Sequence, residues 1–433
     1  MRRVPVLAVI LFLLPGMLAA QQQDPREEKY EQRLATLEAR LRALEVELQE
    51  LKAARAPREQ APAGGARLLL ASATGRALDP APAANLPQPQ GGGAAQLPTY
   101  GGASSAAKAL NPDISVIGDF LGAVGRNRVR TVPALELHET EVGLQAIIDP
   151  YARGDFFISF GESGVNVEEG YMTFTSLPGG FVARAGKMRA AFGKINTIHN
   201  HALEWIDRPL VTENLIGGED GINDAGLSFT RILPAPAGIF LEATGQVYRG
   251  DSADLFKSSQ RKDVGYVAHL RGYKDLSEST NLDLGFSYAR GHNDLGSAFH
   301  TQLYGMDATL RWKPLRRSIY HSFVARTELV WSKRDQLTLA LLPETQRAFG
   351  FFTSAEYRLN RRWTVGGRYD RSGRARQAKQ TDSGFSALLT YWPSEFSQIR
   401  GQYRFGRYAE GQDANELRFQ FLFVLGAHGA HPF

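Results

Sequence analysis

The segment Glu416–Leu425, near the end of the chain, alternates between apolar and polar side chains. One face is apolar and carries Phe419, Phe421, Phe423 and Leu425. The opposite face carries Arg418 and Gln420. Successive side chains of a β-strand point to opposite sides, so one face of this segment suits lipid and the other suits water. The pattern predicts a transmembrane β-strand.

Similar segments recur from about residue 113 onward, and we predict sixteen strands. The predicted spans are 113–124, 134–148, 153–161, 165–176, 180–190, 225–233, 238–248, 264–273, 281–290, 301–313, 319–332, 349–360, 363–371, 384–392, 397–408 and 415–426. Only a closed barrel lets strands cross a bilayer with every backbone group paired. The predicted fold is therefore all-β, with a 16-stranded antiparallel transmembrane β-barrel over residues 111–433.

The connections between the predicted strands alternate in character. Short turns rich in Pro, Gly or Asp follow even-numbered strands, as at Asp149-Pro150 and Pro234–Pro236. Longer polar segments follow odd-numbered strands, at 249–263, 333–348 and 372–383. Transmembrane barrels have short periplasmic turns and longer outer loops, and an even strand count places both termini in the periplasm.

Aromatic residues near the predicted strand ends suit the two interfacial girdles of a membrane barrel. They are Tyr248, Trp312, Trp331, Trp363, Tyr391 and Trp392. Soluble β proteins also place aromatic residues at strand ends, so a β-sandwich or propeller is the alternative. Most of the predicted strands have 9 to 14 residues, which is long for that alternative.

The first 20 residues read as a secretory signal peptide. Arg2 and Arg3 precede an apolar stretch that ends at Leu14, and small residues lead to a cleavage site near Ala20. A membrane anchor is the alternative, but spanning needs roughly 20 apolar residues. The chain has no cysteine, and its formal charge of +5 contains no polybasic block, so neither a disulfide framework nor a nucleic-acid partner is predicted.

Residues 21–56 are predicted to form a periplasmic α-helical coiled coil. Apolar residues recur with strict 4-3 spacing from Tyr30 onward, and the predicted oligomerisation residues are Leu34, Leu37, Leu41, Leu44, Leu48 and Leu51. Flanking charges are opposite in sign for a parallel assembly, as in Arg40 with Glu45. A single amphipathic helix is the alternative. Residues 57–110 are rich in Ala, Gly and Pro and are predicted to be a linker.

The chain resembles the Gram-negative porins through its sixteen predicted strands, its long segment after the fifth strand and its terminal Phe433. The segments Asn111–Phe120 and Trp205–Val211 also resemble outer-membrane proteins grouped loosely with the phosphate-selective porins. The resemblance implies a homotrimer in outer-membrane lipid that passes small hydrophilic solutes, with Phe433 read by the barrel-assembly machinery. Porins usually end within the last strand, whereas Gly426–Phe433 follows it here.

In trimeric porins the loop after strand five folds into the barrel and narrows the pore. The resemblance therefore implies an inward loop over residues 191–224, which carries two positive and six negative side chains. The candidate constriction residues are Lys194, His199, His201, Glu204, Asp207, Arg208 and Glu213.

The predicted water-facing positions of strands eleven to sixteen are rich in arginine. The candidate pore-wall residues are Arg326, Arg358, Arg368, Arg400, Arg404 and Arg418. An acidic loop opposite this arginine wall would set up a field across the lumen. The alternative is that the arginines pair with carboxylates on neighbouring strands.

The His199-x-His201 pair has no fixed geometry in a loop, and no cysteine supports it, so neither a metal nor another cofactor is predicted. No nucleophile elbow, phosphate loop or zinc-protease helix is present, so no enzymatic function is predicted. The predicted function is passive diffusion of small hydrophilic solutes. A phosphate- or anion-selective channel and an envelope tether anchored by the barrel are the alternatives.

A peptide of residues 30–51 should form a helical, parallel oligomer. Changing Leu41→Ser and Leu44→Ser together should abolish the oligomer, because each buried leucine contributes about 2–5 kcal/mol. Circular dichroism and analytical ultracentrifugation measure the two properties. Arg42→Ser with Ala43→Ser, on the outer face of the predicted helix, is the matched control. A wild-type peptide that stays monomeric and unfolded at high micromolar concentration contradicts the prediction.

Overall fold

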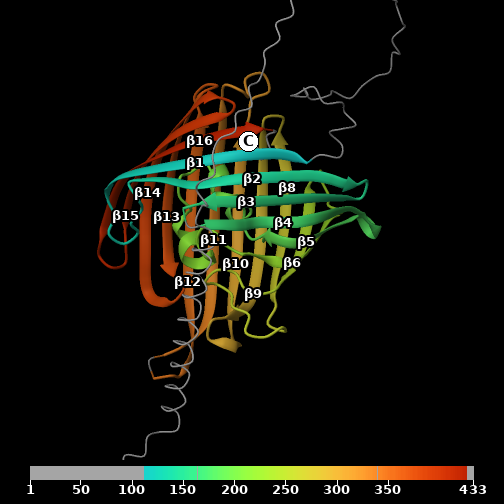
Figure 1. Ribbon diagram of the computed structural model, residues 1–433, viewed down its shortest axis with the longest axis vertical. Coiled ribbons are helices and arrows are strands. Elements are labelled where there is room, and N and C mark those ends of the chain that lie inside the picture. The colour runs from blue at the N-terminus through green and yellow to red at the C-terminus, as the bar shows by residue number, and fades with distance from the viewer. Residues whose placement is uncertain (1–111, 163, 339, 427–433) are drawn as a thin grey trace, which may run out of the picture. The chain divides into compact units, whose positions relative to one another are not determined.

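The computed structural model describes residues 112–162, 164–338 and 340–426. These residues contain sixteen strands (Figure 1). The strands are β1 (Asp113–Arg126), β2 (Leu135–Asp149), β3 (Ala152–Gly161), β4 (Gly164–Leu177), β5 (Phe181–Arg189), β6 (Asn223–Leu233), β7 (Phe240–Tyr248), β8 (Gly265–Ser277), β9 (Thr280–Asn293), β10 (Gly296–Trp312), β11 (Ser322–Leu337), β12 (Pro343–Arg358), β13 (Trp363–Arg374), β14 (Gln377–Ser394), β15 (Ser397–Arg407) and β16 (Asp413–Gly426). The predicted signal peptide, the coiled coil with its leucines, the linker and Phe433 lie outside the described residues.

Each strand pairs antiparallel with its neighbours in chain order, and β1 closes the sheet against β16. At this closure Phe120 lies opposite Phe421. The predicted all-β, 16-stranded antiparallel barrel is therefore confirmed. Within the described ranges, no helix is long and apolar enough to cross a membrane.

The two faces of β16 lie as their alternation predicts. Phe419 and Phe421 remain 46% and 42% exposed on the outer surface. Arg418 and Gln420 are buried on the inner side. Leu422 and Val424 also point inward and pack against Ile117 of β1. The outer surface of the barrel therefore offers apolar side chains to lipid.

Two of the three predicted long outer loops are wrong. β11 continues to Leu337 and β12 begins at Pro343, so 333–348 is mostly strand. β13 ends at Arg374 and β14 begins at Gln377, so 372–383 is also mostly strand. Polar side chains on both faces led to the loop prediction, but a strand that extends past the apolar band into water keeps its ladder with such residues. The long connections are 190–222 and 249–264.

Two of the six predicted girdle aromatics point into the barrel instead. Tyr248 is 3% exposed and belongs to an interior apolar cluster. Trp392 lies under the guanidinium of Arg358, 5.3 Å from its carbon to the ring centroid. By contrast, Trp331 and Trp363 are more than a third exposed. The position of an aromatic residue near a strand end therefore does not determine whether its ring lies on the inner or the outer face of the barrel.

A peptide tag inserted in the 249–264 connection should be reached by antibody on intact cells. A tag in the 234–239 connection should be reached only after the outer membrane is permeabilised, because short turns between strands lie on the periplasmic side. Immunofluorescence before and after permeabilisation measures the difference. Reversed accessibility contradicts the predicted orientation.

Candidate pore constriction

The connection between β5 and β6, residues 190–222, has a closed neck. Its ends meet through the Ala190 N–H, which donates to the Ile222 carbonyl at 2.8 Å. The Asn196 side chain donates to the carbonyls of Ala190 and Ile222 and accepts the Ile222 N–H at 2.9 Å. Three short helical turns follow within the connection, η2 (Ile195–Thr197), η3 (Asn200–Ala202) and η4 (Thr212–Ile216). We call residues 190–222 the inner loop.

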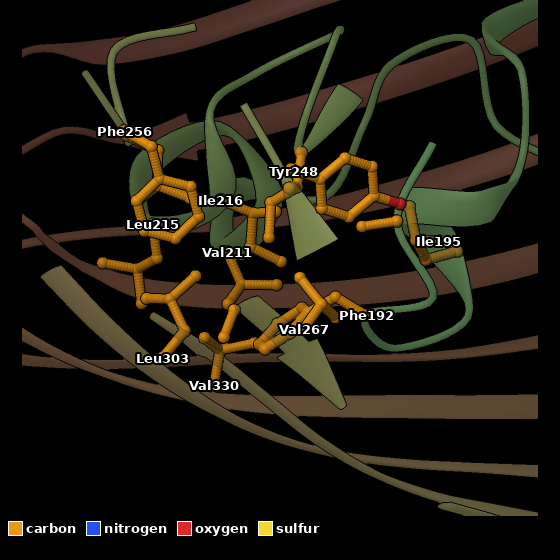
Figure 2. Packing of buried hydrophobic residues seen from close by; sticks show 14 of the residues in the cluster. Phe192, Ile195, Val211, Leu215, Ile216, Tyr248, Phe256, Val267, Leu303 and Val330 are labelled. Atoms are coloured by element: carbon orange, nitrogen blue, oxygen red, sulfur yellow. The ribbon is translucent and has the colours of Figure 1, made fainter. Parts of the chain in front are cut away.

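Apolar residues of the inner loop pack against the inner side of the barrel (Figure 2). Phe192, Val211 and Ile216 are fully buried in this cluster. The wall contributes Val267, Ala289, Leu303, Val330 and Phe352, which lie on β8 to β12. Complete burial of such a side chain contributes about 1.5–3 kcal/mol. This packing holds the inner loop on one side of the lumen.

The sequence contains a pattern that indicates this packing, namely apolar residues at inward strand positions. Val267, Leu303 and Val330 occupy inward positions, where a water-filled barrel has polar residues. Apolar residues at both parities in the middle of β8, β10 and β11 indicate that something apolar covers the inner side of these strands.

The start of the inner loop approaches the wall through its backbone. Glu328 of β11 accepts the Lys194 N–H at 2.7 Å, and Ser287 of β9 accepts the Gly193 N–H at 2.9 Å. Gly193 has φ +60°, and a Cβ there would lie 1.6 Å from the Glu328 carboxylate. Glycine is therefore required at this position for both its conformation and its space.

The inner loop meets the arginine wall directly. Glu204 lies 2.6 Å from Arg326 Nη2. Asp207 lies 2.8 Å from Arg368 and 3.1 Å from Arg404, and it also accepts the Gln402 amide at 2.6 Å. Burial alone would raise the pKa of the Asp207 carboxyl, but Arg368 and Arg404 hold it well below its usual range. The acidic loop and the arginine wall were expected to face each other across the lumen. At these residues they are in direct contact instead.

The other predicted wall arginines lie outside these pairs. Arg400 donates to Gln420 at 2.6 Å, and Arg418 lies 3.2 Å from Glu416. Arg358, the last residue of β12, stacks on Trp392. Pairing with a carboxylate of a neighbouring strand describes Arg326, which lies 4.0 Å from Glu356 of β12. Arg368 and Arg418 lie 2.8 Å from Asp370 and 3.2 Å from Glu416 of their own strands. Arg326, Arg368 and Arg404 also pair with the inner loop.

Further predicted residues of the inner loop have structural contacts. Arg208 is buried and donates to the carbonyls of Ile195 and Ile198, which holds the loop in its folded form. Glu213 lies 3.3 Å from Arg130 of the β1–β2 connection. The predicted loop end at Asp224 belongs instead to β6, where Asp224 pairs with Arg249.

On the opposite side, the inner loop meets a carboxylate wall that the sequence analysis missed. It is formed by Glu139 and Glu141 of β2 and Glu168 and Glu169 of β4. The His199 ring nitrogens lie 2.7 Å from Glu141 and 2.7 Å from Glu169, and His201 Nδ1 lies 3.1 Å from Glu139. Burial lowers the pKa of His199, but the surrounding carboxylates outweigh burial and raise that pKa well above its usual value.

The carboxylate wall was difficult to predict because Glu168 and Glu169 are adjacent in sequence. Side chains of adjacent residues in a regular strand point to opposite faces. The register between β3 and β4 shifts at Phe157 and Ile158, and this irregularity lets both glutamates point inward.

A cavity of about 390 Å³ remains between the inner loop and β1, β2, β15 and β16. Its acidic lining residues are Asp119, Glu136, Asp207, Glu213 and Glu219. Its basic lining residues are Arg130, His138, Arg208, Arg404 and Arg418. Polar groups of both signs therefore border the space that the inner loop leaves open.

No family model matches the chain. An uncharacterized protein of Aquifex aeolicus (strain VF5) is 29% identical over 387 residues, which cover 75% of this chain and 81% of that protein. An anion-selective porin from Comamonas acidovorans shares the fold with a TM-score of 0.52 and 10% identity, over 72% of this chain and 99% of that one.

The outer membrane channel DcaP of Acinetobacter baumannii aligns with a TM-score of 0.49 and 12% identity, over 73% of this chain and 96% of that one. The chain has the 16-stranded barrel fold of the Gram-negative outer-membrane porins.

Proposed function

We propose that the protein is an outer-membrane porin through which small hydrophilic solutes diffuse passively. The observation that carries this proposal is the cavity with charges of both signs between the inner loop and the wall of a closed sixteen-stranded barrel. Barrels of this strand number enclose water, whereas eight-stranded barrels are filled by side chains. The inner loop would narrow this channel to the space lined by polar groups.

The proposed setting is the bacterial outer membrane, with lipid against the exposed apolar side chains of the strands. The proposed assembly is a homotrimer whose coiled coil, residues 21–56, stands in the periplasm. The barrel-assembly machinery and small hydrophilic solutes complete the proposed partners. Support for self-association comes from the heptad spacing of the leucines and their flanking charges.

An anion-selective channel is the second candidate, since the similar protein from Comamonas acidovorans is described as anion-selective. The lining of the cavity argues for weak selectivity instead. Arg404 pairs with Asp207 and Arg130 pairs with Glu213, so part of the positive charge is neutralised in place. Glu219, which also lines the cavity, lies 3.8 Å from His138 and has 64% of its side chain accessible, so it adds negative charge to the lining.

The wild-type protein should form an open pore in planar bilayers, and Asp207→Asn should increase its single-channel conductance. Removing this carboxylate leaves the buried Arg404 without its ion-pair partner and leaves Arg368 with Asp370 alone, which costs about 3–5 kcal/mol and releases the inner loop. Asp220→Asn is the matched control, because Asp220 is an exposed acid of the same loop. A wild-type barrel that conducts no ions would refute the porin proposal.

Two single substitutions should shift ion selectivity in opposite directions. Glu219→Gln should move the reversal potential toward anion preference, and Arg130→Gln should move it toward cation preference, because both side chains line the cavity. The measurement uses a salt gradient at low ionic strength, since the screening length is about 10 Å at 0.1 M. Lys274→Gln, at an exposed position of β8, is the control. Shifts of the same sign would show that another path carries the ions.

A further inference from the structure

The contact between the inner loop and the carboxylate wall has the composition of a metal site. His199 and His201 come from the inner loop, and Glu141 comes from β2. One ligand atom from each of these three buried residues lies within 4.8 Å of the others. A His-x-His pair in a loop has no fixed geometry in the sequence, and the folded inner loop supplies that geometry.

The distances between the donor atoms suit one small ion. Glu141 Oε2 lies 2.7 Å from His199 Nδ1 and 3.8 Å from His201 Nδ1. Glu168 Oε2 lies 3.2 Å from His199 Nδ1. Ligands at about 2.0–2.2 Å from a tetrahedral Zn²⁺ are separated by about 3.3 Å from one another. The observed distances between donor atoms lie on both sides of this value. An ion between them therefore needs only small side-chain adjustments.

The surrounding groups add two features of metal sites. Glu169 Oε2 lies 2.7 Å from His199 Nε2, so it can hold the imidazole with Nδ1 directed at the ion, as carboxylates behind metal-binding histidines do. Glu141 is 1% exposed, and its Oε1 has no hydrogen-bond partner among the residues that the structure describes. A buried carboxylate oxygen without a partner is costly unless a ligand or ion compensates it.

The charge balance also favours a cation. Four glutamates are buried together, and Arg189 pairs with only one of them, Glu168, at 3.2 Å. The other carboxylates need compensating positive charge. A divalent ion would supply it more fully, because it contacts several carboxylates at once. Asn200, which lies between the two histidines in the sequence, lines the cavity.

We propose that Glu141, His199 and His201 form a binding site for one divalent transition-metal ion of the zinc class, with Glu139 and Glu168 beside them. Two imidazoles with carboxylates suit Zn²⁺ better than Mg²⁺ or Ca²⁺, which prefer oxygen ligands alone. The ion would fasten the inner loop to β2. This inference is independent of the proposed porin function, since a barrel without a conducting pore could hold the same ion.

The test uses the full chain, purified in detergent and stripped with EDTA, with Zn²⁺ as the probe. Isothermal titration calorimetry and elemental analysis should find one Zn²⁺ per chain. His199→Gln and His201→Gln should each abolish this binding, and so should the nearly isosteric Glu141→Gln. Glu169→Gln should weaken binding by about 10- to 100-fold without abolishing it. Heat-modifiable migration on gels verifies that each variant has folded.

The matched control is the double variant His292→Gln with His300→Gln, which removes the other close histidine pair, whose rings lie 4.4 Å apart. This variant should bind Zn²⁺ as the wild type does. Co²⁺ added to the stripped wild type should give the strong visible absorption of a tetrahedral site, and the Glu141→Gln variant should not. Absence of stoichiometric binding by the wild type, or its loss in the control alone, overturns the proposal.

Discussion

The closure of β1 against β16 is the constraint on which the rest of the structure depends. An open sheet in hydrocarbon would expose a row of unpaired N–H and C=O groups, each costing several kcal/mol. Twelve residue pairs, from Ser115 with Gly426 to Arg126 with Asn415, remove that edge. Once the ladder is closed, the outward side chains can all be apolar, and the inward ones are free to serve the lumen.

The inward side chains differ in chemistry from one part of the barrel wall to another. Apolar residues of β8 to β12 face one side of the inner loop, carboxylates of β2 and β4 face another, and arginines of β11, β13 and β15 face the third. A buried charge on the wall is costly alone, and several of these charges gain a partner from the inner loop. Asp207 with Arg368 is one such pair, and His199 with Glu141 is another. The loop is therefore a structural element of the barrel as well as the narrowing of its lumen.

The sequence predicts the barrel well because period-2 alternation and short turns are local signals. It also identified the connection after the fifth strand and the charged residues on it. It did not identify their partners, since Glu204 with Arg326 and Asp207 with Arg404 join residues that are far apart in the chain. The paired glutamates Glu168 and Glu169 were hidden by a bulge, because strict alternation allows only one of them to point inward. Strand ends were misjudged where polar hairpins extend past the apolar band.

The same long-range contacts set the order in which the molecule can mature. Asp207 is translated nearly two hundred residues before Arg404, and Gln420 meets Asp119 across a separation of 301 residues. Such contacts form late, because the entropy of closing the intervening chain is lost before the contact is gained. The inner loop can complete its arginine contacts only after β15 has joined the sheet, because Arg404 lies on that strand. Until then Asp207 lacks the second of its two arginine partners, so one oxygen of this carboxylate depends on water until the last strands are in place.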